Sequence, residues 1–159
     1  SGFQITQPPR FNKDLAIVLN TFQNYLKATQ DRIKYELERC KALNLPFGAK
    51  MVRGAYMVEE RRLAREYAYE DPIHSTIEGT HQNYNNNIEY LLSNWIPGSQ
   101  VIIASHNENS VNWGKHLITK YNINSQKGSV SFAQLLGLGD HLTHSLASEV
   151  KPFYSNKLI

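Results

Sequence analysis

The feature that most constrains the fold is a set of short apolar runs separated by longer, more polar stretches. Three runs stand out, at residues 16–20 (AIVLN), 49–56 (AKMVRGAY) and 101–105 (VIIAS), and a weaker fourth lies at 129–134 (SVSFAQ). Their apolar residues do not alternate strictly with polar ones, which is typical of strands buried on both faces of a parallel sheet. We therefore predict four parallel strands.

The stretches between these runs have helical periodicity, as parallel strands require of their crossover connections. One helix is predicted through residues 26–40, one from a capping box at Ser75 and Glu78 to residue 95, and one from an N-cap at Asn109 to about residue 122. The segment 50–62 starts as a strand and ends as a helix. We interpret the NYNNN stretch, which falls inside the second long helix, as a solvated face. The chain is therefore predicted to be α/β.

A doubly wound sheet and a (β/α)₈ barrel both suit this order of elements. The dinucleotide fingerprint G-x-G-x-x-G is absent, since GLGD at 137–140 lacks a third glycine at the required spacing. A barrel is favoured because polar residues gather at the carboxyl ends of the predicted strands, where barrels place their chemistry. These residues are Asn20, Gln23, Arg53, Tyr56, Ser105, His106, Asn107 and Gln134.

A complete barrel needs eight strands and about 250 residues, whereas this chain has 159 residues and four recognisable strands. We therefore predict a partial (β/α)₈ TIM-type barrel, with residues 1–159 as a single partial domain. Half a barrel leaves two open sheet edges, through which it could self-associate. The chain begins SGFQ, and we expect that Ser1 is not the natural start.

Composition excludes several functional classes. The net charge of +3 is spread without a basic run, so no nucleic-acid partner is expected. No apolar run approaches the roughly 18 residues of a membrane span. The single cysteine, Cys40, excludes an internal disulfide. His141 and His144 have helical spacing but no third ligand with clear spacing, so no metal site is expected.

The end of the second run carries most of the candidate chemistry. Gly54 either lets a planar ligand approach the backbone or forms a strand-end bulge. Lys50 and Arg53 lie on an apolar strand, where an unpaired charge is expensive. They are expected to meet an anionic ligand, the electron-rich edge of a cofactor or water; for Arg53 the alternative is an ion pair with Glu59 or Glu60.

The third run ends in a similar way. His106 and Asn107 directly follow VIIAS and precede a predicted helix, whose N-terminus attracts anions. A histidine in this position suits either a structural hydrogen bond or a ligand contact.

Five sequence blocks together resemble the proline dehydrogenase family, particularly its eukaryotic members. The blocks are IVLNTFQNYLK, KMVRGAYMVEERR, YEDPI followed by Thr80 and Tyr84, ASHNENSV and FAQLLGLGD. Their order and spacing match over roughly residues 17–146, and the tail at 147–159 diverges. The resemblance implies a distorted (β/α)₈ barrel, of which this chain holds the fourth to seventh strands.

The resemblance also implies an activity. Family members bind FAD and oxidise L-proline to Δ1-pyrroline-5-carboxylate by hydride transfer to the flavin. In eukaryotes the electrons then pass to ubiquinone at the matrix side of the mitochondrial inner membrane. The protein positions the cofactor and tunes its charge.

Site residues follow from the resemblance position by position. It assigns Lys50 and Tyr56 catalytic roles, with Lys50 beside the flavin and Tyr56 packed on the substrate ring, and it places Met51 in an apolar wall of the proline pocket. The remaining matched positions are assigned to the cofactor: Asn20, Val52, Arg53, Gly54, Ala55, Ser105, His106 and Gln134.

The chain also departs from the family pattern. The substrate lysine and acidic residue of the family belong to earlier strands, and the paired arginines that hold the proline carboxylate belong to a later helix; the chain has no counterpart of either. We therefore expect a truncated chain that is inactive alone. Two alternatives stay open: a catalytically dead half-barrel that binds a partner or self-associates, and an unrelated flavin- or phosphate-binding barrel.

Overall fold

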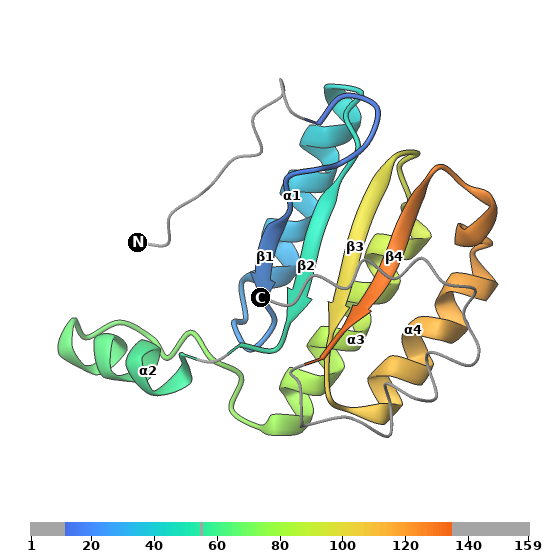
Figure 1. Cartoon of the computed structure of the whole chain (residues 1–159). Coiled ribbons are helices and arrows are strands. Elements are labelled where there is room, and N and C mark those ends of the chain that lie inside the picture. Colours follow the sequence, from blue (N-terminus) through green and yellow to red (C-terminus); the bar gives the residue numbers. More distant parts are fainter. Residues whose placement is uncertain (1–11, 55, 135–159) are drawn as a thin grey trace.

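The computed structural model describes residues 12–54 and 56–134, and these residues form one sheet with helices on one of its faces (Figure 1). The elements in chain order are β1 (Asn20–Gln23), α1 (Thr29–Ala42), β2 (Gly48–Val52), α2 (Met57–Glu66), α3 (Ile77–Ser93), β3 (Ser99–Ala104), α4 (Glu108–Lys120), the 3₁₀ turn η1 (Ile123–Ser125) and β4 (Gly128–Ala133).

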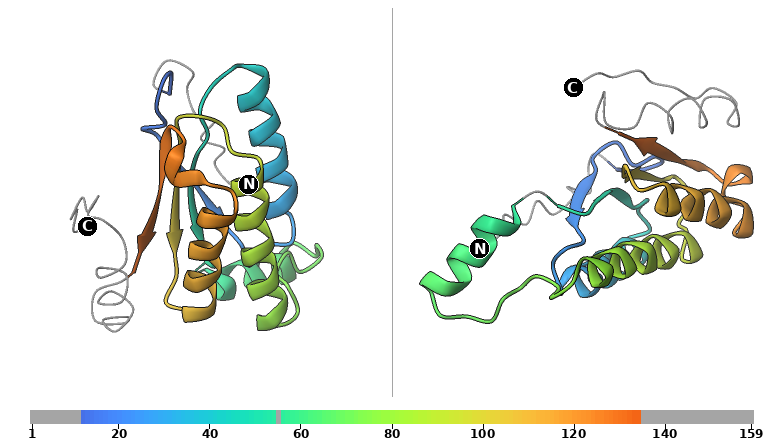
Figure 2. Two further views of the ribbon diagram at one scale, coloured as in Figure 1. Left: turned by 90° about the vertical axis from the view of Figure 1, so that its right-hand side faces the viewer. Right: turned by 90° about the horizontal axis from the view of Figure 1, so that it is seen from below.

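The four strands pair in the order β1-β2-β3-β4, and every pair is parallel. Helices α1, α3 and α4 cover one face of the sheet, while α2 extends away from it beyond the strand ends (Figure 2). This confirms the predicted fold of four parallel strands with helical crossovers, as in a partial (β/α)₈ barrel. No helix in the described part of the chain is both long and apolar enough to cross a membrane.

The register of the sheet decides which side chains meet the helices. Phe22, Met51 and Ile103 lie opposite one another on β1, β2 and β3, and each is at most 2% exposed. Because successive side chains of a strand point to opposite faces, the next row lies on the face away from the helices. We call it the open face, since none of the described helices covers it (Figure 2). Lys50 of β2 belongs to that row, between Thr21 and Ile102.

The helices complete the core from the other side. Ile33, Leu37 and Cys40 of α1 are buried, as their spacing predicts, and Tyr84 and Ile88 of α3 are fully buried. Burial raises the pKa of the Cys40 thiol to about 11, so little of it is in the reactive thiolate form at neutral pH.

The first strand was misplaced by the sequence prediction, which put it at residues 16–20. Residues 16–18 are held outside the ladder because the Asn12 side chain accepts hydrogen bonds from the backbone N–H groups of Ile17 and Val18, at 2.9 and 3.0 Å. Pairing with β2 starts only at Asn20. Asn20 therefore begins β1 instead of ending it.

Two predicted helix starts are displaced by one or two residues. Thr76, not Ser75, caps α3 by accepting a bond from the Gly79 N–H at 3.0 Å. Asn107, not Asn109, caps α4 by accepting from the Ser110 N–H at 3.0 Å. Both caps use the expected side-chain chemistry.

The NYNNN stretch is not the solvated face that we predicted. Asn87 is fully buried and donates to the Oδ1 atom of Asn24 at 2.8 Å, and Asn83 donates to the Asn24 carbonyl at 2.9 Å. Asn24 in turn donates to the carbonyls of Phe22 and Val52. These amides satisfy backbone groups where β1 and β2 end, which is why polar side chains are tolerated there.

Replacing Asn87 by alanine should therefore cost stability. The change leaves Asn24 Oδ1 buried without its donor from α3, and we expect the free energy of unfolding to fall by about 2–3 kcal/mol. Urea titration followed by circular dichroism measures the loss. Asn86→Ala, at the exposed neighbouring position, is the matched control and should change stability by no more than about 0.5 kcal/mol. Equal losses in the two variants would contradict the role given to the network.

Candidate functional site

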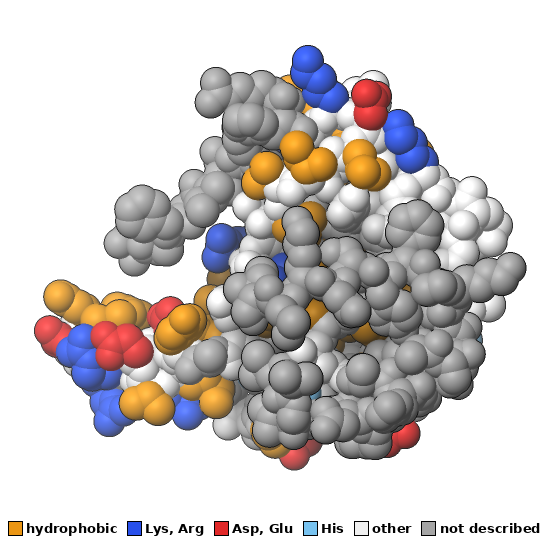
Figure 3. Space-filling model, in the orientation of Figure 1, with side chains coloured by type: hydrophobic (Ala, Val, Ile, Leu, Met, Phe, Trp, Pro, Cys, Tyr) orange, Lys and Arg blue, Asp and Glu red, His pale blue; other side chains and the backbone are white. Residues whose placement is uncertain are grey.

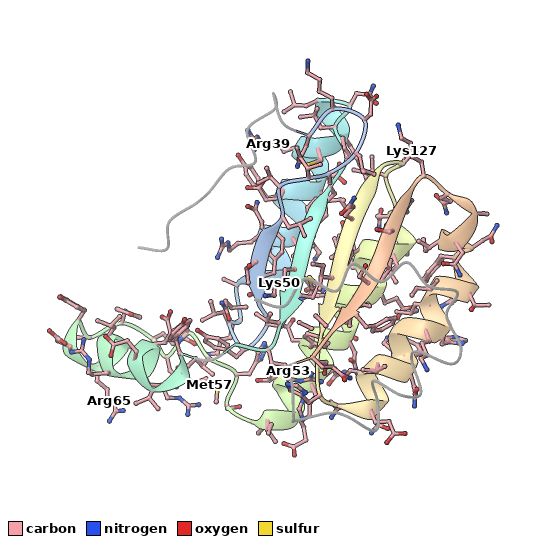
Figure 4. The ribbon with its side chains drawn as sticks, in the orientation of Figure 1. Arg39, Lys50, Arg53, Met57, Arg65 and Lys127 are labelled. Carbon is pink, nitrogen blue, oxygen red and sulfur yellow. The ribbon has the colours of Figure 1, made fainter. Side chains whose placement is uncertain are left out.

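The carboxyl ends of β2 and β3 meet at one edge of the sheet, together with the first turns of α3 and α4 (Figure 4). In parallel α/β folds this edge is where ligands bind. The sequence had pointed to the same strand ends, and the structure places Arg53 and Ser105 in direct contact across them, with 2.6 Å between Nη1 and Oγ.

Arg53 is the centre of this edge. Its Nε donates to His81 Nδ1 at 2.8 Å, and its two terminal nitrogens donate to the hydroxyls of Ser105 and Ser110 at 2.6 and 2.7 Å. The guanidinium also lies over the Tyr84 ring, 4.3 Å from its centroid. Burial lowers the pKa of Arg53, but an arginine stays charged at any ordinary pH.

The alternative ion pair of Arg53 with Glu59 or Glu60 is wrong. Glu59 is bound instead by Arg62 on the same helix, at 2.8 Å. Within residues 12–54 and 56–134, Arg53 bonds only to neutral side chains. The charge is therefore stabilised by hydrogen bonds and by an aromatic face, both of which lower the cost of burying it.

Ser105 and Tyr84 complete the cluster. The Ser105 hydroxyl oxygen accepts hydrogen bonds from Arg53 and from the Asn107 N–H, the latter at 3.0 Å. The backbone N–H of Ser105 donates to the Ala133 carbonyl of β4. Tyr84 donates its hydroxyl to the Ala104 carbonyl at 3.0 Å. Burial raises the pKa of Tyr84 far above its usual range, and the neighbouring Arg53 charge only partly opposes this.

Gly54 follows the end of β2, which stops at Val52 and not at Tyr56 as predicted. Its φ is +121°, and a Cβ at this position would overlap the ring of Tyr25. The Tyr25 N–H donates to the Arg53 carbonyl at 2.8 Å. This backbone bond holds Tyr25 beside Gly54. The positive φ and the close contact with Tyr25 both require glycine at this strand end.

Lys50 lies on the open face of the sheet (Figure 4). Its side chain is exposed, and the ammonium has no hydrogen-bond or ion-pair partner in the described ranges. Val52 follows it on the same face, two residues nearer the carboxyl edge. An unpaired cation on this face is available to an anionic or electron-rich ligand.

Gln23, which the sequence analysis listed with Asn20 among the polar residues at strand ends, lies at the carboxyl edge of the sheet. Gln23 ends β1 beside Val52 on the open face, and its Oε1 is buried without a hydrogen-bond partner. Asn20 shares the helix-facing row with Ala49, at the opposite end of the strand, so the cofactor role predicted for Asn20 does not suit its position. The sequence analysis named Gln23 among the strand-end residues but gave it no cofactor role.

The other predicted residues fall in different places. Met51 is fully buried between the sheet and the helices, so it does not reach the face that carries Lys50. Tyr56 caps α2 and is 65% exposed. His106 is exposed at the end of β3, and Gln134 directly follows β4. Ala55, His141 and His144 lie outside the described residues. Within those residues, no three His, Cys, Asp or Glu side chains are grouped as metal ligands.

The YEDPI block anchors the segment that returns from α2. Ile73 pairs with Leu26 in an antiparallel bridge, Lys27 donates its N–H to the Pro72 carbonyl at 2.8 Å, and the His74 N–H donates to the Tyr25 carbonyl at 3.0 Å. These bonds fix the position of Tyr25. Helix α2 itself bears interspersed apolar and charged side chains (Figure 3).

The sequence of the chain is similar to those of several characterised proteins. A family model described as proline dehydrogenase matches residues 4–156. The chain is 40% identical over 137 residues to the mitochondrial proline dehydrogenase 2 of Arabidopsis thaliana, covering 85% of the chain and 29% of the relative. It is 35% identical to the human mitochondrial proline dehydrogenase 1 (91% and 24%) and 39% identical to a hydroxyproline dehydrogenase of Xenopus laevis (81% and 28%). The chain thus spans less than a third of these relatives.

Solved structures share the fold. Proline utilization A from Bdellovibrio bacteriovorus, inactivated by N-propargylglycine, superposes with a TM-score of 0.78 at 24% identity, covering 91% of the chain and 14% of that protein. A mutant of the Bradyrhizobium japonicum protein superposes with a TM-score of 0.69 at 25% identity, covering 82% and 13%.

Gly54→Ala should destabilise the chain, because the added Cβ overlaps the Tyr25 ring and the backbone has a positive φ. We expect a loss of about 2 kcal/mol or more, measured by urea unfolding. Gly79→Ala is the control: its backbone has no positive φ and its Cβ would lie 3.2 Å from Thr76 Oγ1, so stability should change by about 1 kcal/mol at most. A Gly54 variant as stable as the parent chain would contradict the packing described here.

Stability should also depend on pH through His81. Burial, and then the Arg53 charge, lower the pKa of His81, so the folded state binds fewer protons than the unfolded state. The contribution of His81 is therefore complete above about pH 6.5 and is lost as the pH falls through the lower pKa of the folded state. Urea unfolding between about pH 5 and 7.5 measures this slope.

The control for this pH dependence is a second histidine. His81→Gln should flatten the pH dependence of stability, whereas His116→Gln, at an exposed position of α4, should leave it almost unchanged. If the stability of His81→Gln changed with pH as steeply as that of the parent chain, protonation of His81 would not be the cause of the pH dependence.

Proposed function

Because the chain belongs to the proline dehydrogenase family, we propose that it forms part of an FAD site at which L-proline is oxidised to Δ1-pyrroline-5-carboxylate. One observation carries the proposal. Among the described residues, the open face of the sheet bears the exposed cation Lys50 and, near its carboxyl edge, the Oε1 atom of Gln23, which has no hydrogen-bond donor there.

Both groups suit a flavin. A buried amide oxygen without a donor costs free energy, and a bound ligand with an N–H or O–H group would satisfy it. Lys50 would hold positive charge against the electron-rich part of the same ligand. When bound, FAD supplies the two-electron acceptor for proline oxidation.

We propose that five residues hold FAD from this chain: Gln23, Lys50, Val52, His106 and Gln134. Gln23, Lys50 and Val52 lie on the open face, and His106 and Gln134 follow the next two strands at the same edge. Gly54 lies just past this edge. We propose that Ala55, which lies outside the described residues, also contributes to the cofactor site, and that Tyr56 packs on the substrate ring. Asn20 and Met51 are left out because they share the helix-facing rows.

The substrate side of the site is incomplete in these 159 residues. A carboxylate in a dry pocket needs bidentate partners, and the family's paired arginines have no counterpart in the sequence. We propose that the chain binds FAD but does not oxidise proline by itself. We also propose a mitochondrial location on the matrix side of the inner membrane, with a quinone as the electron acceptor. The names of the relatives support a mitochondrial location, and they suggest that the substrate is proline or hydroxyproline.

A second candidate function is self-association. In the described sheet, β1 and β4 are edge strands, each paired on one side only. Such edges offer unpaired backbone groups to another chain. A dimer seen by light scattering together with an absence of flavin binding would favour this function over the first.

The main test is a flavin titration. Purified chain is titrated with FAD, and binding is followed by flavin fluorescence and by retention of yellow colour through gel filtration. Lys50→Gln should weaken binding about tenfold, the effect of losing one charge-assisted contact. Proline-dependent dye reduction should stay at the level of a flavin-only blank.

Lys127→Gln is the matched control. Lys127 lies at the opposite, amino end of the sheet (Figure 4), 4.0 Å from Asp14, so its loss should leave FAD affinity unchanged. Absence of FAD binding by the parent chain, or equal effects of the two lysine variants, would overturn the proposed site.

A further inference from the structure

We propose that Arg53 is a positioning residue: it fixes the carboxyl end of β3 and the first turn of α4, and so sets the place of His106, without touching the cofactor. The inference rests on the proposed function for its link to FAD. Its structural part concerns contacts within this chain alone.

The direction of the Arg53 side chain is the first ground. Its partners His81 and Tyr84 belong to α3 and Ser110 to α4, the helices that cover the face opposite Lys50. The guanidinium therefore lies on the helix side of the sheet edge. A ligand on the open face would meet Lys50 and Val52 and not this group.

The second ground is that both acceptor positions of the Ser105 hydroxyl are used within the protein. Its hydroxyl oxygen accepts from Arg53 at 2.6 Å and from the Asn107 N–H at 3.0 Å, and the residue is only 6% exposed. An sp³ hydroxyl oxygen has two acceptor positions, and both are used. In the predicted Ser105–His106 pair, only His106 is left at the surface.

These bonds together determine how the chain turns from β3 into α4. Ser105 holds the Asn107 N–H, and Asn107 caps α4 through the Ser110 N–H. Arg53 holds the hydroxyls of both serines, so one side chain from β2 fixes both ends of the turn that carries His106. The distance between the β2 surface and His106 is thereby set by Arg53.

Arginine suits this role and lysine does not. The three acceptors, one imidazole nitrogen and two hydroxyl oxygens, lie around a planar group that also stacks on Tyr84. A lysine ammonium is a single point of charge and cannot reach three acceptors in these directions. Arg53→Lys therefore keeps the charge and removes the geometry.

The experiment has two parts, and the first uses flavin-free chain. Amide hydrogen exchange is measured in the parent chain, in Arg53→Lys and in Arg32→Gln, which changes an exposed arginine of α1. In Arg53→Lys we expect the amides of Asn107 and Ser110 to exchange about tenfold faster, with α1 unchanged. Unchanged exchange at these two amides, or uniform acceleration along the whole chain, would overturn the inference.

The second part asks whether Arg53 acts through His106. FAD affinity is measured for Arg53→Lys, His106→Ala and the double variant. If Arg53 only positions His106, Arg53→Lys should weaken FAD binding in the parent chain but have little further effect once His106 is alanine. Additive losses would mean that Arg53 contacts the cofactor directly or acts elsewhere, and would overturn the proposal.

Ser110→Ala keeps the test decisive if Arg53→Lys fails to fold. It leaves the arginine and the acceptors of both amides in place and removes only the hydroxyl through which Arg53 holds α4. Faster exchange of the same two amides and the same non-additivity with His106→Ala are expected. If the parent chain binds no FAD, the proposed function fails, while the exchange data still decide whether Arg53 fixes this segment.

Discussion

The structure depends on satisfying the backbone where parallel strands end. In a parallel sheet all carboxyl ends emerge at one edge, and carbonyls that run past the ladder must find other donors. Here Asn24 donates to the Val52 carbonyl, Tyr84 to the Ala104 carbonyl, and Asn83 to the Asn24 carbonyl. Asn24, Asn83 and Tyr84 thus stabilise the fold by donating hydrogen bonds to backbone carbonyls at this edge.

That requirement separates two kinds of polar residue at the edge. Arg53, Ser105 and Ser110 face the helices and bond to one another, whereas Lys50 and Gln23 belong to the open face. The first group can position a site, and the second can contact a ligand. The family resemblance alone assigns Arg53 and Ser105 to the cofactor together with Lys50, because matched positions carry no information about the direction of a side chain.

The sequence predicted much of the architecture for identifiable reasons. The runs at β2, β3 and β4 are apolar and flanked by breakers, and α1 shows its buried face through Ile33, Leu37 and Cys40. It failed at β1, where the Asn12 side chain takes two backbone N–H groups out of the ladder. It also failed at NYNNN, where buried amides look like surface residues. Both failures involve hydrogen bonds made by asparagine side chains, which hydrophobic periodicity does not report.

The sequence by itself determined the order of the parallel strands and helices, because local hydrophobic patterns predict them. It also determined the family, because the order and spacing of the five sequence blocks match that family. Only the tertiary structure decided which polar side chains are available to a ligand. A one-residue change of register exchanges the two faces of a strand, and the directions of Gln23, Met51 and Arg53 depend on pairing with neighbouring strands. The close contact of Tyr25 with Gly54 was likewise decided by packing, because it joins the segments that follow β1 and β2.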